Sequence, residues 1–206
     1  MAKSTAAMGV KRPVEKEKKK TVKSDKPEPE RKEKPAVKQK DPMKLKPLKL
    51  NVGCGEMYLE GFVNIDLHNP KADITANVIS LPMFADNTVD EIYSSHVIEH
   101  FHFHDGLLAM KEWHRILRPG GKLYIEAPEL LGICRKFLNE PPENHIELYY
   151  QLFGQPWFPG QTHLFGYTEN QMRWSLESIG FKNLRRMAAM RFTNLVDVCQ
   201  LWEAEK

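Results

Sequence analysis

The sequence predicts an α/β fold in which short buried strands alternate with helices and loops. A first apolar run, Leu48 to Val52, stops at a glycine turn, and a second, Phe62 to Ile65, stops at an acid, Asp66. Short apolar runs bounded by turn residues are typical of buried strands. Helical periodicity alternates with strand-like runs further along the chain, and this favours parallel strands joined by crossovers.

The turn after the first run, Gly53-Cys54-Gly55, and the acid after the second run form the pattern of a nucleotide-binding half-unit. Glycine permits positive φ and lets a ligand approach the bare backbone, and the acid can accept hydrogen bonds from ribose hydroxyls. Asp66 lies 11 residues after Gly55, whereas a dinucleotide-binding fold has about 20. Residues 56–61 hold one or two helical turns at most. The spacing therefore favours a ligand with an amino acid end over a pyrophosphate, which binds at a helix N-terminus.

The rest of the chain continues the alternation of strands and helices. Residues 72–84 should hold a short third strand and a loop, residues 89–94 a fourth strand, and residues 122–127 a fifth. Apolar residues at helical spacing predict a helix over residues 99–117. After the fifth strand we expect three helices, at residues 130–139, 143–153 and 169–179, and an antiparallel hairpin of residues 181–189 and 192–202.

Four segments resemble, in order and spacing, the class I S-adenosylmethionine-dependent methyltransferases of the type 11 kind. They are LNVGCG (50–55), VNIDL (63–67), ISLPMFADNTVDEIYSSHVIEHF (79–101) and ILRPGGKLYIEAPE (116–129). The resemblance covers residues 48–190. It implies a Rossmann-like, seven-stranded, mostly parallel sheet with helices on both faces and a C-terminal antiparallel hairpin. It also implies S-adenosylmethionine as the cofactor and methyl transfer as the activity.

The resemblance assigns the cofactor contacts residue by residue. The glycine turn holds the methionine part, Asp66 the ribose, and Asn77 the adenine amino group, unless Asn77 only shapes a turn. The two residues after Ser94 line the floor of the site. The predicted cofactor-binding residues are Gly53, Cys54, Gly55, Asp66, Asn77, Ser95 and His96.

Two positions depart from the pattern of the family. Its glycine turn begins with an acid and has three glycines, but this chain has Asn51 at the acid position and Met57 at the third glycine position. Asn51 cannot act as an anion near the ammonium group of the cofactor. A weaker site for S-adenosylmethionine, or other acceptors such as Ser95 and backbone carbonyls, would follow.

Methyl transfer to a hydroxyl needs a general base, most often histidine. The candidate catalytic residues are His163, which lies in an aromatic loop of residues 155–168, and His100. We expect the acceptor between residues 96–104 and this loop, with His163 as its polar contact. Packing, capping and loop hydrogen bonds are the alternative roles for these histidines.

The motif His96-Val-Ile-Glu99-His100 also fits the His-x-x-Glu-His pattern of inverted zinc peptidases. On one helix the two histidines would share a face as zinc ligands. The segment follows a strand at the predicted cofactor edge, however, and the type 11 family often carries a similar Leu-Glu-His there. We therefore expect no metal site.

Composition divides the chain into a tail, residues 1–46, and a methyltransferase domain, residues 47–206. The tail holds 16 Lys and Arg against 7 Asp and Glu, and no aromatic residue. Such a segment cannot bury enough apolar surface to fold, so we expect disorder. It either makes weak contacts with nucleic acid or another polyanion or only solubilises the protein. The three scattered cysteines and the lack of a membrane span or secretory signal predict a cytoplasmic protein.

We expect transfer of a methyl group from S-adenosylmethionine to an unidentified acceptor, with hydroxyls of sugars, lipids or small metabolites favoured. The alternative is a protein with the same fold that binds without turnover and is tethered to nucleic acid by its basic tail. The altered glycine turn is the main support for this alternative.

Overall fold

The computed structural model describes residues 46–157, 160–189 and 198–206 of the 206-residue chain. The chain divides into two units, residues 1–38 and 39–206, and all described residues belong to the second. The predicted tail lies outside the described residues except for Lys46, and its disorder stays a prediction.

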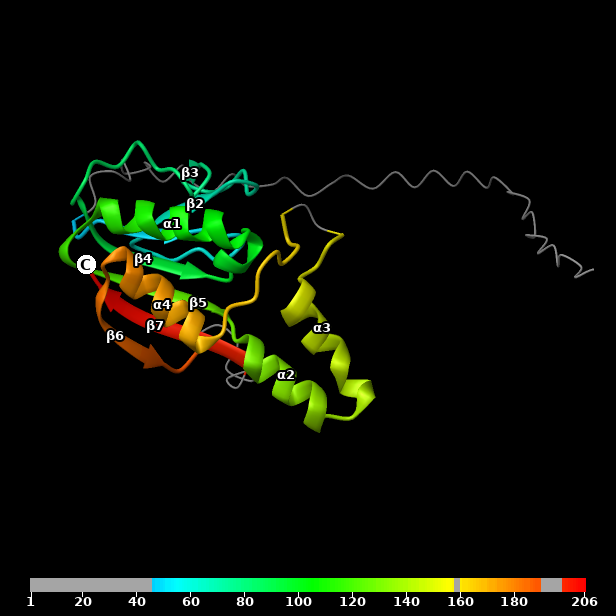
Figure 1. Ribbon diagram of the computed structural model, residues 1–206. Coiled ribbons are helices and arrows are strands. Elements are labelled where there is room, and N and C mark those ends of the chain that lie inside the picture. The colour runs from blue at the N-terminus through cyan, green and yellow to red at the C-terminus, as the bar shows by residue number, and fades with distance from the viewer. Residues whose placement is uncertain (1–45, 158–159, 190–197) are drawn as a thin grey trace, which may run out of the picture. The chain divides into compact units, whose positions relative to one another are not determined.

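The centre of the fold is a seven-stranded sheet with the order β3-β2-β1-β4-β5-β7-β6 (Figure 1). β1 pairs in parallel with β2 and β4, β2 with β3, and β4 with β5, whereas β7 runs antiparallel between β5 and β6. The predicted mostly parallel sheet with a C-terminal antiparallel hairpin is confirmed. The strands are β1 Lys49–Val52, β2 Val63–Asp66, β3 Ile74–Thr75, β4 Val89–Ser95, β5 Leu117–Pro128, β6 Lys182–Met187 and β7 Cys199–Glu205.

Strand order reverses between β1 and β4, because the chain turns to one side through β2 and β3 and to the other through β5. Ligands of parallel sheets bind beyond the carboxyl ends of the strands at such a point. The loops after β1, β2 and β4 therefore enclose the expected site. The hairpin begins as predicted, but its second strand continues to Glu205, and residues 190–197, where we expected it to start, lie outside the described residues.

The helices are α1 Phe103–Ile116, α2 Leu130–Asn139, α3 His145–Phe153 and α4 Glu169–Ile179, with short 3-10 turns η2 Ile98–His100 and η3 Pro142–Asn144. α2 and α4 match the prediction residue for residue. The expected helix over residues 99–117 starts four residues later, because His96 has a φ of 56° and Phe101 is extended, so the chain makes one tight turn first. Similarly, the expected helix at residue 143 begins within η3, which starts at Pro142, and α3 follows from His145.

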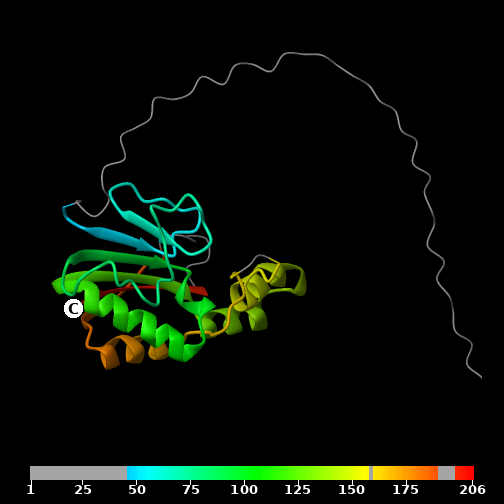
Figure 2. The same ribbon diagram turned by 90° about the horizontal axis from the view of Figure 1, so that it is seen from above.

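α1 and α4 pack side by side against the sheet (Figures 1 and 2). Buried side chains of both helices, including Met110, Trp113 and Leu176, join the strands in one hydrophobic core. The Trp113 indole N–H donates to the Val78 carbonyl at 2.9 Å, which fixes the loop after β3 against α1. This core holds the strand ends at the switch point in fixed positions.

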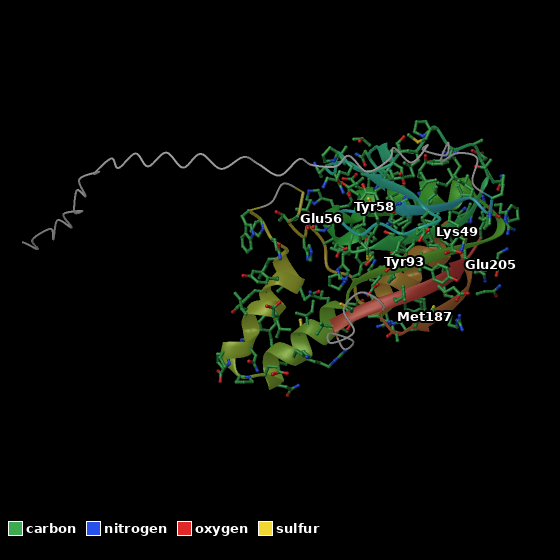
Figure 3. The ribbon with its side chains drawn as sticks, turned by 180° about the vertical axis from the view of Figure 1, so that it is seen from behind. Lys49, Glu56, Tyr58, Tyr93, Met187 and Glu205 are labelled. Carbon is green, nitrogen blue, oxygen red and sulfur yellow. The ribbon has the colours of Figure 1, made fainter. Side chains whose placement is uncertain are left out.

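The opposite face of the sheet is lined by charged side chains. Figure 3 shows Lys49, Tyr93 and Glu205 on this face, and no helix of the described residues crosses it. Lys49 pairs with Glu91 at 2.8 Å on the neighbouring strand, and Lys122 pairs with Glu205 at 2.8 Å. Opposite charges across strands stabilise a solvated sheet face. The sequence predicts helices on both faces, but the β1–β2 and β2–β3 connections hold no helix.

Within the described residues, no helix has both the length and the apolar content to cross a bilayer.

The two ends of α4 are set by a capping threonine and a glycine. The Thr168 hydroxyl accepts a hydrogen bond from the Gln171 N–H at 3.1 Å, and Gly180, with a φ of 115°, ends the helix. Thr168→Ala leaves that N–H unpaired and should lower the free energy of unfolding by about 1 kcal/mol in urea denaturation. Thr168→Ser keeps the hydroxyl and should lose less than half as much. Equal losses in both variants would contradict the capping role.

Candidate functional site

The glycine turn after β1 takes the shape that its residues require. Gly53 and Gly55 have positive φ, 67° and 51°, and the Cys54 N–H donates to the Ile65 carbonyl at 3.0 Å. A Cβ on Gly53 would lie 2.3 Å from Val97 Cγ2, so only glycine fits there. A Cβ on Gly55 would meet nothing within 4 Å, which leaves open space for a ligand above that backbone.

Cys54, between the two glycines, is buried. Burial, with a smaller contribution from the nearby Asp66 carboxylate, raises the pKa of its thiol to about 11. The thiol is therefore neutral at physiological pH and is a packing residue, because the thiolate is the nucleophilic form.

Asp66 lies at the end of β2 beside the turn, as predicted. One carboxylate oxygen accepts from the Gly55 N–H at 2.8 Å, and the other accepts from the N–H groups of His68, at 2.7 Å, and Asn69, at 2.8 Å. A carboxylate has about four acceptor positions, so three are in use. One ribose hydroxyl can donate to Asp66 directly, and a second would have to replace one of these backbone donors.

The two departures from the family pattern, Asn51 and Met57, are directly linked. The buried Asn51 side chain donates to the Met57 carbonyl at 2.7 Å and to Asn64 Oδ1 at 2.9 Å. Asn64 also accepts from the Leu59 N–H, at 2.9 Å, and donates to the Asp73 carboxylate, at 3.1 Å. This network fixes the loop after the glycine turn without a helix. Figure 3 labels Glu56 and Tyr58 in this loop.

Asn77 lies exposed in the loop after β3. Its Oδ1 accepts from the Ile79 N–H at 3.0 Å, and its carbonyl accepts from the Ser80 N–H at 3.1 Å. The oxygen that the resemblance assigns to adenine is thus used in a turn, which is the alternative that the sequence left open. Its contact with adenine stays a prediction.

Ser95 and His96 lie at the carboxyl end of β4, where the sequence predicts the floor of the site. Ser95 Oγ is buried, 3.5 Å from the Glu126 carboxylate. His96 turns away from the strand direction and places Nδ1 3.0 Å from Glu99 Oε1, so its side chain faces the next turn of the chain.

The two predicted catalytic histidines, 63 positions apart, meet in space. The rings of His100 and His163 pack edge to face with centroids 4.8 Å apart. His163 Nε2 lies 3.9 Å from Glu99 Oε1, so the buried Glu99 carboxylate sits beside both imidazoles. In the sequence, Glu99 stands out only as part of the zinc-peptidase pattern. Its place next to an ionisable pair becomes visible only when the loop around His163 is placed.

Hydrogen bonds determine the tautomers of both histidines. Nδ1 of His100 lies 3.1 Å from the Thr162 carbonyl, and Nδ1 of His163 lies 3.0 Å from the Gln151 carbonyl. A carbonyl oxygen only accepts, so each Nδ1 carries the hydrogen. In the neutral ring, Nε2 then holds the lone pair that can take a proton or bind a cation.

The charges in this group follow from burial and pairing. Burial opposes ionisation of Glu99, but the hydrogen bond from His96 and the nearby imidazoles outweigh it and lower its pKa, so the group is a carboxylate. Burial lowers the pKa of His163, against the opposing charge of Glu99. His163 is therefore neutral at pH 7.

The aromatic residues of the loop before α4 divide between the core and the surface. Tyr167 is buried, and Phe165 packs on Phe103 with ring centroids 4.9 Å apart. Trp157 is exposed and contacts the Tyr150 ring, whereas residues 158–159 lie outside the described residues. Phe165 and Tyr167 thus anchor the loop that carries His163.

The buried Asn51 network gives a prediction on stability. Asn51→Asp would place carboxylate oxygens against the Met57 carbonyl and Asn64 Oδ1, both acceptors, and should lower the free energy of unfolding by at least about 2 kcal/mol. Urea denaturation measures this. Asn170→Asp, an exposed change in the first turn of α4, should stay within about 0.5 kcal/mol. A stable Asn51→Asp variant would show that the network does not hold the loop.

Comparison with known proteins agrees with this geometry. A family model described as a methyltransferase domain matches residues 60–125, from the loop before β2 to β5. No curated protein matches the chain significantly.

Solved structures resemble the chain over most of its length. An S-adenosylmethionine-dependent methyltransferase from Archaeoglobus fulgidus has a TM-score of 0.54 at 14% identity, covering 77% of this chain and 85% of its own. One from Mesorhizobium loti has a TM-score of 0.51 at 15% identity and covers 77% and 90%. The 1,6-didemethyltoxoflavin-N1-methyltransferase of Burkholderia thailandensis, with bound S-adenosylhomocysteine, has a TM-score of 0.50 at 14% identity and covers 77% and 70%. The predicted resemblance is confirmed: the methyltransferase-domain model matches residues 60–125, and the chain has the fold of the class I S-adenosylmethionine-dependent methyltransferases.

Proposed function

We propose that this protein is an enzyme that transfers the methyl group of S-adenosylmethionine to an acceptor hydroxyl, with sugars, lipids and small metabolites as the favoured classes of acceptor. The observation that carries the proposal is the pair of imidazoles after β4, His100 and His163, which lie close to the carboxylate of Glu99. A hydroxyl, unlike an amine with a free lone pair, needs a base to take its proton.

The cofactor supplies a methyl group already activated by a sulfonium, so the protein has to bind, align and exclude water. The open backbone at Gly55 and the Asp66 carboxylate beside it suit the methionine and ribose parts, and the solved relative with bound S-adenosylhomocysteine supports this cofactor. Gly53, Cys54, Ser95 and His96 complete the proposed cofactor site, and Asn77 is its proposed adenine contact.

The acceptor is proposed to lie between residues 96–104 and the loop that carries His163. Its hydroxyl donates a hydrogen bond to His163 Nε2. The hydrogen bond from His163 Nδ1–H to the Gln151 carbonyl holds the ring in the tautomer that can accept it. His100 is the second candidate base, since its Nδ1 likewise donates to a carbonyl, that of Thr162. The oxygen then attacks the methyl carbon while the carbon–sulfur bond breaks.

A second candidate function is binding of the cofactor without turnover. Asn51 favours it, because a buried amide that donates to Met57 and Asn64 takes the place of the family's acid. Formation of S-adenosylhomocysteine with a panel of hydroxyl acceptors separates the two functions.

Two further proposals concern the protein's surroundings. A cytoplasmic location rests on the composition, and weak contact with nucleic acid or another polyanion rests on the excess of Lys and Arg in residues 1–46. If polyanions bind there, their affinity should fall steeply with salt, because lysine contacts release counterions.

Calorimetry tests the cofactor site. Asp66→Ala should weaken binding of S-adenosylmethionine at least about tenfold, since a charge-assisted hydrogen bond is worth about 1.5–3 kcal/mol. Asp86→Ala, an exposed aspartate outside the site, should leave the affinity unchanged. Absence of binding to the folded wild type at millimolar ligand would refute the cofactor assignment.

Kinetics test the base. His163→Ala should lower kcat by about 10²–10⁴ with the affinity for S-adenosylmethionine little changed. Because a protonated ring cannot accept a proton and burial lowers the pKa of His163, activity should rise with pH through an apparent pKa below 6.5, the ordinary histidine value. His114→Ala, which changes a histidine near the C-terminal end of α1 and outside the proposed acceptor site, is the control.

The outcome for His163→Asn separates two roles, since asparagine can hydrogen-bond but cannot act as a base. Turnover near the wild-type rate in this variant would mean that His163 only orients the acceptor. Wild-type turnover in His163→Ala would remove it from the site and leave His100 as the base.

A further inference from the structure

Three side chains of the candidate site that could bind a metal ion lie close together. Glu99, His100 and His163 each offer one ligand atom, and these atoms lie within 4.8 Å of one another. They come from η2 and from the loop before α4, and the loop is tied to η2 by the Leu164 and Phe165 N–H groups, which donate to the Glu99 carbonyl at 2.7 and 3.2 Å. Backbone hydrogen bonds thus fix the positions of the two segments relative to each other.

Each imidazole is arranged as metal-binding histidines usually are. A ligating histidine donates its other ring N–H to a carbonyl or carboxylate, which fixes the ring and leaves the second nitrogen for the metal. His100 makes this hydrogen bond to Thr162 and His163 makes it to Gln151. In the neutral form each ring therefore keeps a lone pair on Nε2, and Nε2 of His163 lies 3.9 Å from Glu99 Oε1.

The cluster contains acceptors that need a positive partner. Glu99 Oε1 accepts from His96, but Oε2 is buried and has no hydrogen-bond partner within the described residues. Burying a carboxylate oxygen without a hydrogen-bond donor or cation beside it is costly. A cation placed among the three side chains would satisfy all of them at once.

We propose that Glu99, His100 and His163 bind one divalent transition-metal ion. Two imidazoles and one carboxylate are the ligand set of catalytic zinc sites and of facial-triad iron or manganese sites, whereas magnesium and calcium prefer oxygen ligands. Ligands on tetrahedral zinc stand on the order of 3.4 Å apart, so the side chains would close by about 1 Å.

The ion deepens the proposed function, and its role in the reaction rests on that function, whereas its binding does not. An acceptor hydroxyl bound to the ion loses its proton more readily, because a divalent cation lowers the pKa of a bound oxygen. The proton passes to bulk water, the oxygen lone pair forms the bond to the methyl carbon, and the electrons of the broken carbon–sulfur bond stay on sulfur. His163 would then be a ligand and not the base. From the sequence we expect no metal site. Bound zinc would therefore distinguish a ligand role for His163 from a role as the base.

Zinc binding to the full chain decides between them. The protein carries Cys134→Ser, which removes an exposed competing thiol, and an affinity tag without histidine. After chelator treatment it is dialysed against micromolar Zn²⁺ without S-adenosylmethionine, and bound zinc per chain is measured. We expect about one zinc per chain in this parent and in His104→Ala, and at least tenfold weaker binding in His100→Ala, His163→Ala and Glu99→Gln.

A parent that holds no zinc, or zinc binding that is unchanged in both His100→Ala and His163→Ala, would overturn the proposal. Glu99 is buried, so if Glu99→Gln fails to fold, as judged by thermal melting, the two histidine variants decide, because both rings lie nearer the surface. The two proposals fail separately. Zinc binding without any turnover of S-adenosylmethionine would refute the proposed enzyme alone. Turnover by a parent protein that binds no zinc in the dialysis would refute the metal site alone.

Discussion

Glu99 is the residue through which the candidate site is held together. Its carbonyl accepts two N–H groups from the loop before α4, and its side chain accepts from His96, so three parts of the chain meet at one buried residue. Together with the packing of Phe165 and Tyr167, these contacts fix the loop that carries His163 relative to the end of β4. A buried carboxylate needs nearby donors or cations, and this need accounts for the histidines gathered around it.

Buried polar side chains also hold the chain together on the other side of the switch point. The β1–β2 connection has no helix, and its loop is held by the buried amides of Asn51 and Asn64, with the Asp73 carboxylate as a further acceptor. Where helices of the described residues leave a sheet face uncovered, cross-strand pairs such as Lys49–Glu91 make the face compatible with water. Polar contacts thus hold the β1–β2 connection and line the uncovered sheet face, where no helix of the described residues packs.

This arrangement bears on the cofactor as well as on stability. Asp66 already accepts three backbone hydrogen bonds, so only a second ribose hydroxyl would have to displace one of them, and Asn77 uses its side-chain oxygen in a turn. Asn51 faces inward to Met57 and Asn64. The departures of the sequence from the family pattern are therefore coupled in structure, because one amide contacts the backbone of the other altered position.

The sequence by itself located most strands, the glycine turn and most helix ends, because these depend on local periodicity, on positive φ at Gly53 and Gly55, and on caps such as Thr168. The seven-stranded sheet was expected from the family resemblance. It also singled out His100 and His163 as ionisable residues near the site. Only the tertiary structure decided that they meet, that Glu99 lies between them, and that their tautomers are fixed by Thr162 and Gln151. Contacts between residues 63 positions apart depend on how α2, α3 and the following loop return to the sheet, and no local pattern records that path.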